Sequence, residues 1–168
     1  MENKTYTFQP EKKIMKQGSF LTDENGQTVY EAKMLKQPLF GSYEFLFINH
    51  ITNKEEKHKV GHTVTSEISS NRYFDVFSTK SSFKFDGKNI WDYLHEEGIR
   101  IDTHASDGKL GLDYDITLKG QSMAAIKMGG KGIIGNRAIF NLITSEEYLD
   151  LAFLVAFAVA RTEQAFLD

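Results

Sequence analysis

Hydrophobic and polar residues alternate with a period of two along most of the chain. In residues 109–119 every second position is apolar: Leu110, Leu112, Tyr114, Ile116 and Leu118. Such alternation is typical of a β-strand with one buried face. We predict further strands at residues 6–9, 14–21, 28–35, 43–50, 57–66, 73–79, 82–85, 99–105, 122–128 and 136–143.

Turn-forming residues separate several of these segments. Asp23-Glu24-Asn25-Gly26 lies between two predicted strands, and Asp86-Gly87 and Asp107-Gly108 are of the same kind. Gly120-Gln121 has the length of a two-residue hairpin turn. Most of the chain is therefore expected to be antiparallel strands joined by short connections.

Two segments break the alternation and are predicted to be helices. Residues 89–97 place apolar side chains three and four positions apart, and Gly98 follows where a helix end favours a left-handed residue. The second helix is expected over about 145–167, where Thr144 and Glu147 have the spacing of a capping box. Its segment Leu151–Ala160 is apolar on every side, which predicts burial on every side.

These elements predict a mainly β (α+β) fold. A buried helix needs strands around it that turn their apolar faces inward, and antiparallel strands can close into a barrel with room inside. We therefore expect a single domain over residues 1–168. The residues are compatible with a β-barrel or with a strongly curled sheet around this helix. Of the two we expect a closed antiparallel β-barrel of about 10–12 strands around the buried hydrophobic C-terminal helix.

Composition narrows the class of protein. The 168 residues contain no cysteine, which excludes a disulfide framework, a Cys-ligated zinc site and a thiol nucleophile. The net charge of −3 argues against a nucleic-acid binder. The N-terminal residues lack the apolar run of a signal peptide, and the apolar helix is shorter than the about 20 residues that span a bilayer. We expect a cytoplasmic protein that is not transmembrane, with peripheral contact to a membrane left open.

The chain resembles the tubby C-terminal-domain-like superfamily, which includes phospholipid scramblases, LURP-one-related proteins and small bacterial members. Three segments carry the resemblance: the hairpin Phe20–Tyr30 with its Asp-x-x-Gly turn, Phe85-Asp86-Gly87-Lys88, and the helix Leu151–Ala160. The resemblance implies a barrel threaded by the terminal helix. It also implies, by type of function, recognition of a phosphoinositide headgroup by basic residues on neighbouring strands.

One glycine-rich segment is the candidate binding site. Residues 130–135 match the pattern G-x-G-x-x-G, but a strand follows where a nucleotide-binding fold needs a helix. Loops rich in free backbone N–H groups also bind anions. We therefore predict an anion or ligand site formed by Lys127, Gly130, Lys131, Gly132 and Arg137.

Other clusters are weaker candidates. His58 and His62 lie four residues apart beside Glu55 and Glu56, but no third metal ligand is defined. Asp102, His104 and Ser106 share one face of a strand and have the residue types of a hydrolase triad without its nucleophile elbow. Asp113 and Asp115 lack the loop of a calcium site. We expect no metal and no cofactor.

Three functions remain open. The leading hypothesis is a non-enzymatic intracellular binding or regulatory module that recognises an anionic lipid headgroup or another phosphate-bearing ligand. The alternative is a structural or protein-interaction scaffold with a protein partner and no small ligand. The third is a hydrolase or a metal-dependent enzyme that uses Asp102 and His104 or His58 and His62.

Overall fold

The structure is a computed structural model that describes residues 2–10, 18–36, 43–70, 75–105, 112–128, 133–134 and 137–162. At positions 62–70, 75–82, 112, 133–134, 137–138 and 162 it describes the backbone alone.

In this part of the chain, eleven strands form one antiparallel sheet in the order β7-β6-β5-β4-β3-β2-β1-β13-β10-β9-β8. The strands before the first helix are β1 (Lys4–Pro10), β2 (Ser19–Thr22), β3 (Thr28–Lys36), β4 (Tyr43–Asn49), β5 (Lys54–Ser70), β6 (Asp75–Phe85) and β7 (Lys88–Asn89). Those after it are β8 (Ile99–Ala105), β9 (Leu112–Leu118), β10 (Gln121–Lys127) and β13 (Phe140–Thr144). A separate short pair joins β11 (Ile133–Ile134) to β12 (Arg137–Ala138).

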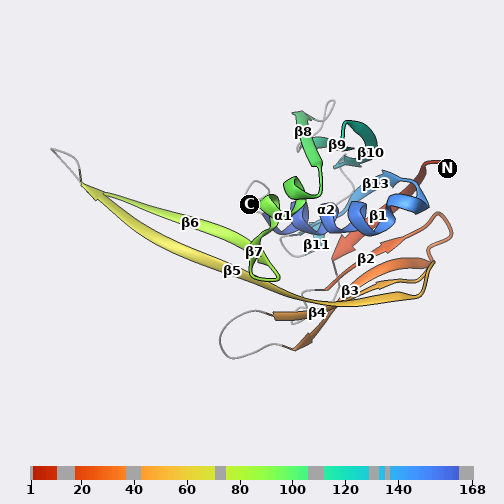
Figure 1. Cartoon of the computed structure of the whole chain (residues 1–168), viewed down its shortest axis with the longest axis horizontal. Coiled ribbons are helices and arrows are strands. Elements are labelled where there is room, and N and C mark those ends of the chain that lie inside the picture. Colours follow the sequence, from red (N-terminus) through yellow and green to blue (C-terminus); the bar gives the residue numbers. More distant parts are fainter. Residues whose placement is uncertain are drawn as a thin grey trace.

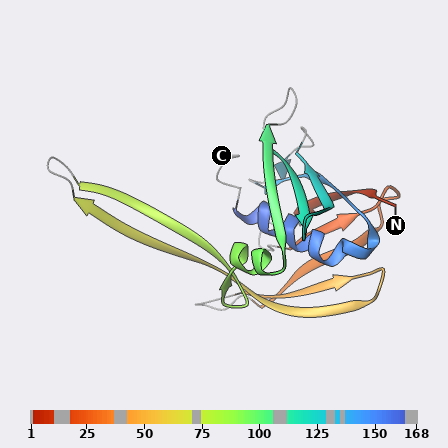
Figure 2. The ribbon, with the colours of Figure 1, turned by 45° about the horizontal axis from the view of Figure 1, so that its top comes forward.

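Two helices and one short 3-10 turn complete the described chain. The helices are α1 (Ile90–Glu96) and α2 (Leu149–Thr162), and the turn η1 (Glu146–Tyr148) leads directly into α2. The C-terminal helix that the apolar pattern predicts is thus present, and it begins four residues later than expected. In Figures 1 and 2 the curled sheet passes around α2, with β1 to β5 and β8 to β10 on different sides of the helix.

Burial around α2 matches its apolar sequence. Every residue from Ala152 to Val159 is buried. Aromatic side chains of the sheet lie against it, because the Tyr30 and Phe153 ring centroids are 4.3 Å apart and those of Phe8 and Phe153 are 5.6 Å apart. At its C-terminal end, the Arg161 guanidinium covers the rings of Phe45 and Phe157. Much of the aromatic content of the chain therefore lies in one core.

The prediction of a closed barrel is wrong. Strands β7 and β8 are the two edges of the sheet and are not hydrogen-bonded to each other. These edges follow one another in the chain, joined by α1, which contacts β6, β7 and β8. A helix is about 10 Å wide, whereas paired strands are about 4.8 Å apart. Because α1 buries Ile90 and Leu94 at this junction, it occupies space that a closing ladder would need.

Of the two predicted helix-end signals, Gly98 agrees with the structure and Thr144 does not. The Asn89 side chain accepts hydrogen bonds from the N–H groups of Trp91 and Asp92, which caps α1. Gly98 adopts φ +90°, as the predicted helix end requires. The predicted capping box at Thr144 is wrong, since the Thr144 hydroxyl donates instead to the Met123 carbonyl oxygen at 3.0 Å. This buried bond ties the end of β13 to β10.

The hairpin of β5 and β6 is longer than predicted. Residues 73–79 and 82–85 were expected to be separate strands, but β6 is continuous from Asp75 to Phe85 and pairs with β5 throughout. Beyond the body the two strands continue as a two-stranded ribbon (Figure 1). The turn between β9 and β10 is formed by Lys119-Gly120, one residue earlier than expected, with positive φ at both positions. The predicted turn at 107–108 lies outside the described residues.

Candidate functional site

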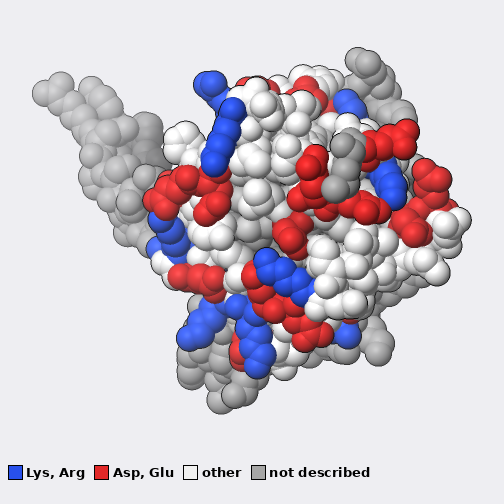
Figure 3. Space-filling view, turned by 45° about the vertical axis from the view of Figure 1, so that its right-hand side comes forward, with Lys and Arg blue, Asp and Glu red and all other residues white. Residues whose placement is uncertain are grey.

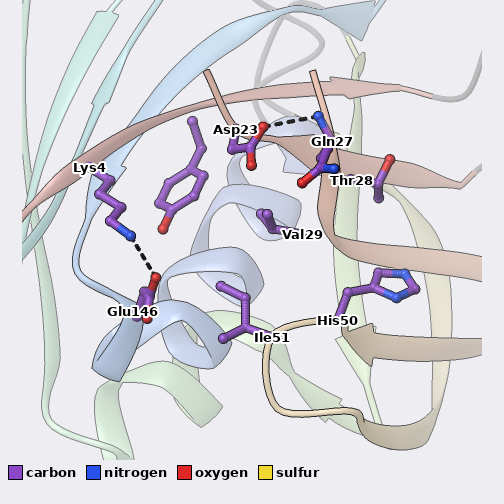
Figure 4. Close-up of a pocket in the computed structure, with 9 residues that line it drawn as sticks. Lys4, Asp23, Gln27, Thr28, Val29, His50, Ile51 and Glu146 are labelled. Carbon is purple, nitrogen blue, oxygen red and sulfur yellow. Dashed lines mark hydrogen bonds and ion pairs between the residues drawn. The ribbon is translucent and has the colours of Figure 1, made fainter. Parts of the chain in front are cut away.

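A hollow of about 280 Å³ opens beside η1, next to the start of α2. Figure 4 shows it, and we call it the Tyr6 hollow. Its lining comes from β1, from the β2–β3 hairpin, from the β4–β5 turn and from η1. The lining residues are Lys4, Tyr6, Asp23, Gln27, Thr28, Val29, His50, Ile51 and Glu146.

Tyr6 forms the inner wall of this hollow. It lies on β1 between β13 and β2, and its side chain is 2% exposed. Its hydroxyl is buried and has no hydrogen-bond partner among the described residues. Burial raises the pKa of Tyr6; the nearby charge of Lys4 lowers it, and the charges of Glu146 and Asp23 raise it further. All three charged residues line the hollow together with Tyr6. The raised pKa keeps the phenol protonated at neutral pH, so its hydroxyl is a donor without an acceptor among the described residues.

Asp23 contributes a second unused oxygen. Its Oδ1 accepts the backbone N–H groups of Asn25 at 2.9 Å and Gln27 at 3.0 Å. These bonds, together with Gly26 at φ +78°, explain why this sequence turns back here. The Oδ2 atom has no partner among the residues that the structure describes, and Figure 4 shows the Asp23 carboxylate at the edge of the hollow.

An ion pair spans another side of the hollow. Lys4 Nζ donates to Glu146 Oε1 at 2.7 Å, which joins β1 to η1 and raises the pKa of Lys4. Opposite, His50 Nε2 lies 3.1 Å from Glu31 Oε1. Ile51 is a large apolar residue that is 41% exposed and adds an apolar wall. The hollow thus combines charges of both signs with one apolar surface.

A second, larger hollow of about 410 Å³ lies where β5, α1 and α2 meet. We call it the acidic hollow, since its lining includes the carboxylates Glu56, Glu97, Glu147 and Asp150. The wall also contains two basic residues, Lys54 and His58. Aromatic rings, including those of Tyr30, Phe47 and Phe85, form most of the rest.

Many of the polar groups of the acidic hollow bind each other. Lys54 Nζ donates to Glu56 Oε1 at 3.1 Å, and the Lys54 ammonium lowers the pKa of Glu56. His58 Nδ1 lies 2.8 Å from Asp86 Oδ2, while its Nε2 lies 3.3 Å from Glu56 Oε2. The His58 ring also packs on Phe85, with centroids 4.5 Å apart. His58 therefore links β5 to the turn after β6.

Asn49 is bonded to a residue of each hollow. It is 2% exposed, and its Nδ2 donates to Asp150 Oδ1 at 3.1 Å. Its Oδ1 accepts the backbone N–H groups of Ile51 at 2.9 Å and Thr52 at 3.2 Å. One side chain thus shapes the β4–β5 turn and fixes it to the first turn of α2.

The anion site predicted around residues 127–137 stays a prediction. Gly130, Lys131 and Gly132 lie outside the described residues, and of Arg137 only the backbone, on β12, is described. Lys127 is on β10, and its Nζ lies 3.7 Å from Asp113 Oδ2. On the face shown in Figure 3, the described basic and acidic residues are interspersed.

The other sequence candidates are engaged elsewhere or only partly described. The structure does not describe the His62 side chain, and Ser106 lies outside the described residues. His104 Nδ1 lies 3.5 Å from Asp115 Oδ2 and its Nε2 lies 4.0 Å from Asp113 Oδ2, both across β8 and β9. Within the described ranges, no group of three or more His, Asp or Glu residues could hold a metal ion. No described helix is both long and apolar enough to cross a membrane.

Sequence reasoning missed the Tyr6 hollow. The sequence predicts Tyr6 in a strand and Asp23 in a turn, and both predictions agree with the structure. The hollow arises because positions 4, 23, 50 and 146 meet in space, and no local pattern marks that meeting.

No protein-family model, curated protein or solved structure shows significant similarity to this chain. The tubby-like resemblance therefore rests on the quoted segments and stays a prediction.

Proposed function

We propose that the protein is a non-enzymatic binding protein that takes a small polar molecule into the Tyr6 hollow. The observation that carries this proposal is the Tyr6 hydroxyl, which is buried without a partner among the described residues. A buried polar group without a partner destabilises a fold by about 1–3 kcal/mol. Such a group in a native protein calls for an explanation, and a bound ligand that supplies the missing bond is one.

The size of the hollow agrees with this proposal. Ligand pockets commonly span about 300–1,000 Å³, and the Tyr6 hollow, at about 280 Å³, lies just below this range. A metabolite of a few heavy atoms therefore fits better than a lipid or a nucleotide. The exposed Ile51 side chain gives such a molecule an apolar surface, while Asp23 and Tyr6 give it polar contacts.

Binding is favoured over catalysis by how the lining groups are used. Lys4 and Glu146 bind each other, and His50 Nε2 is engaged by Glu31. Among the described residues none accepts the proton of the Tyr6 hydroxyl, so no base is positioned to activate it.

Thermal unfolding of the purified full chain with a panel of small polar metabolites at millimolar concentration tests the proposal. We expect at least one compound to raise Tm in the wild type and to lose this effect in Tyr6→Phe, which removes only the hydroxyl. Tyr43→Phe, on β4 outside both hollows, is the matched control and should keep the effect. A panel without any hit, or hits that Tyr6→Phe keeps, would favour the scaffold alternative.

A further inference from the structure

The polar groups of the Tyr6 hollow that remain available are of two opposite kinds. On one side are donors: the Tyr6 hydroxyl, which has no partner among the described residues, and the Lys4 ammonium. An ammonium group carries three N–H donors, and Lys4 directs one of them to Glu146 at 2.7 Å. An anionic oxygen beside Tyr6 would therefore accept from the hydroxyl and from a further N–H of Lys4.

The other side of the hollow presents an acceptor. Asp23 Oδ1 is used by the two backbone N–H groups of its own turn, which leaves Oδ2 for a ligand. A ligand ammonium is the strongest donor that this oxygen can receive, because hydrogen bonds between ionised groups are about twice as strong as neutral ones. The Gln27 and Thr28 side chains lie on the same hairpin and offer further polar contacts.

We infer that the ligand of the Tyr6 hollow is a small zwitterion, with its carboxylate toward Tyr6 and Lys4 and its ammonium toward Asp23. This inference rests on the proposed function. A simple carboxylate would give Asp23 Oδ2 no donor and would add a negative charge beside Asp23 and Glu146, with no ligand ammonium to offset it. A simple amine would leave the Tyr6 hydroxyl without an anionic acceptor and would face the Lys4 ammonium. Only a molecule with both a carboxylate and an ammonium group pairs with the donors of Tyr6 and Lys4 and with the Asp23 acceptor.

Isothermal titration calorimetry of the full chain with matched probes tests this inference. The probes are glycine, β-alanine and 4-aminobutyrate, together with the amine and the carboxylate that each becomes when one end group is removed. We expect one zwitterion to bind about tenfold or more tightly than either of its single-charge analogues, the factor that one charge-assisted bond supplies.

Two variants separate this inference from the proposed function. Asp23→Asn keeps an oxygen for the β2–β3 turn but removes the charge, so the preference for the zwitterion over its carboxylate should fall by about tenfold. Tyr6→Phe should weaken binding of the zwitterion and of the carboxylate alike. A carboxylate or an amine that binds as tightly as the zwitterion, and is lost in Tyr6→Phe, would overturn the zwitterion and leave the proposed function standing. Absence of binding by all nine probes, or an unchanged preference in Asp23→Asn, would also overturn the zwitterion.

Discussion

The Tyr6 hollow and the acidic hollow differ in how their polar groups are hydrogen-bonded. The acidic hollow is larger, about 410 Å³ against about 280 Å³, and its lining has four carboxylates where the Tyr6 hollow has two. Yet Lys54, Glu56, His58 and Asp150 of the acidic hollow are bound to one another or to neighbouring side chains. The smaller hollow contains the hydroxyl that lacks a partner.

Tyr6 and Tyr30 show this difference between the two hollows. Both Tyr6 and Tyr30 are nearly buried, at 2% and 6% exposure. Burial and the nearby Asp150 carboxylate hold the pKa of the Tyr30 phenol far above its usual range. The Tyr6 hydroxyl is buried without a hydrogen-bond partner among the described residues. The charged groups of the acidic hollow thus bind one another, whereas the Tyr6 hydroxyl is without an acceptor in the described part of the chain.

The largest expected effect comes from Asn49, which is bonded to a residue of each hollow. Asn49→Ala removes the donor to Asp150 and the acceptor for two backbone N–H groups at a buried position. We expect the free energy of unfolding to fall by about 3 kcal/mol, as measured by urea denaturation. Ligand binding in the Tyr6 hollow should weaken as well, because the turn that presents His50 and Ile51 loses its support.

The control for this variant is Asn25→Ala. Asn25 lies exposed on the β2–β3 turn, and its side chain forms no hydrogen bond with the described residues. Its substitution should change stability by less than about 0.5 kcal/mol. Equal losses in the two variants would show that Asn49 does not link the hollows.

A pair of hydroxyl deletions tests the difference between the hollows directly. Tyr30→Phe removes a hydroxyl that lies beside the Asp150 carboxylate and should lower the free energy of unfolding by about 1 kcal/mol. Tyr6→Phe removes a buried hydroxyl without a protein partner and should raise it by about 0.5–1 kcal/mol in the absence of ligand. Urea denaturation of both variants measures the two signs. A similar loss of stability in both variants would contradict the view that only the Tyr6 hydroxyl lacks a hydrogen-bond partner.

The smallest effect is the dependence of stability on alkaline pH. The pKa values of Tyr6 and Tyr30 are raised in the folded protein, chiefly by burial. Above pH of about 10 the unfolded chain loses these phenolic protons while the folded protein keeps them. The unfolded state then binds fewer protons, so the free energy of unfolding falls as pH rises. Urea midpoints between pH 8 and 11 should show this decline. Tyr30→Phe should flatten it more than Tyr43→Phe, because Tyr43 is only partly buried.

Local features of the fold could be predicted from the sequence because their causes are local. The apolar run at 151–160 predicts a buried helix whatever surrounds it, and α2 is one. Asp86-Gly87 predicts a tight turn, and both residues adopt positive φ. The capping box failed because a tertiary contact competed with it: Thr144 is close enough to Met123 to bond there instead.

The closure of the sheet could not be predicted in the same way. Period-two alternation reports which face of a strand is buried, but not which strand lies beside it. Whether β7 and β8 pair depends on where α1 packs, and its two buried residues, Ile90 and Leu94, hold it at the junction. A count of strands therefore suggested a barrel where the sheet stays open.

The sequence by itself determined the elements of this protein: alternating strands, tight turns and one helix apolar on all sides, since each depends on neighbours a few residues apart. The tertiary structure decided the open sheet and the candidate site. Lys4, Asp23, His50 and Glu146 come from four separate segments, and only long-range strand pairing brings them around the Tyr6 hydroxyl. Whether a buried polar group finds a partner is settled by that packing, which no local pattern encodes.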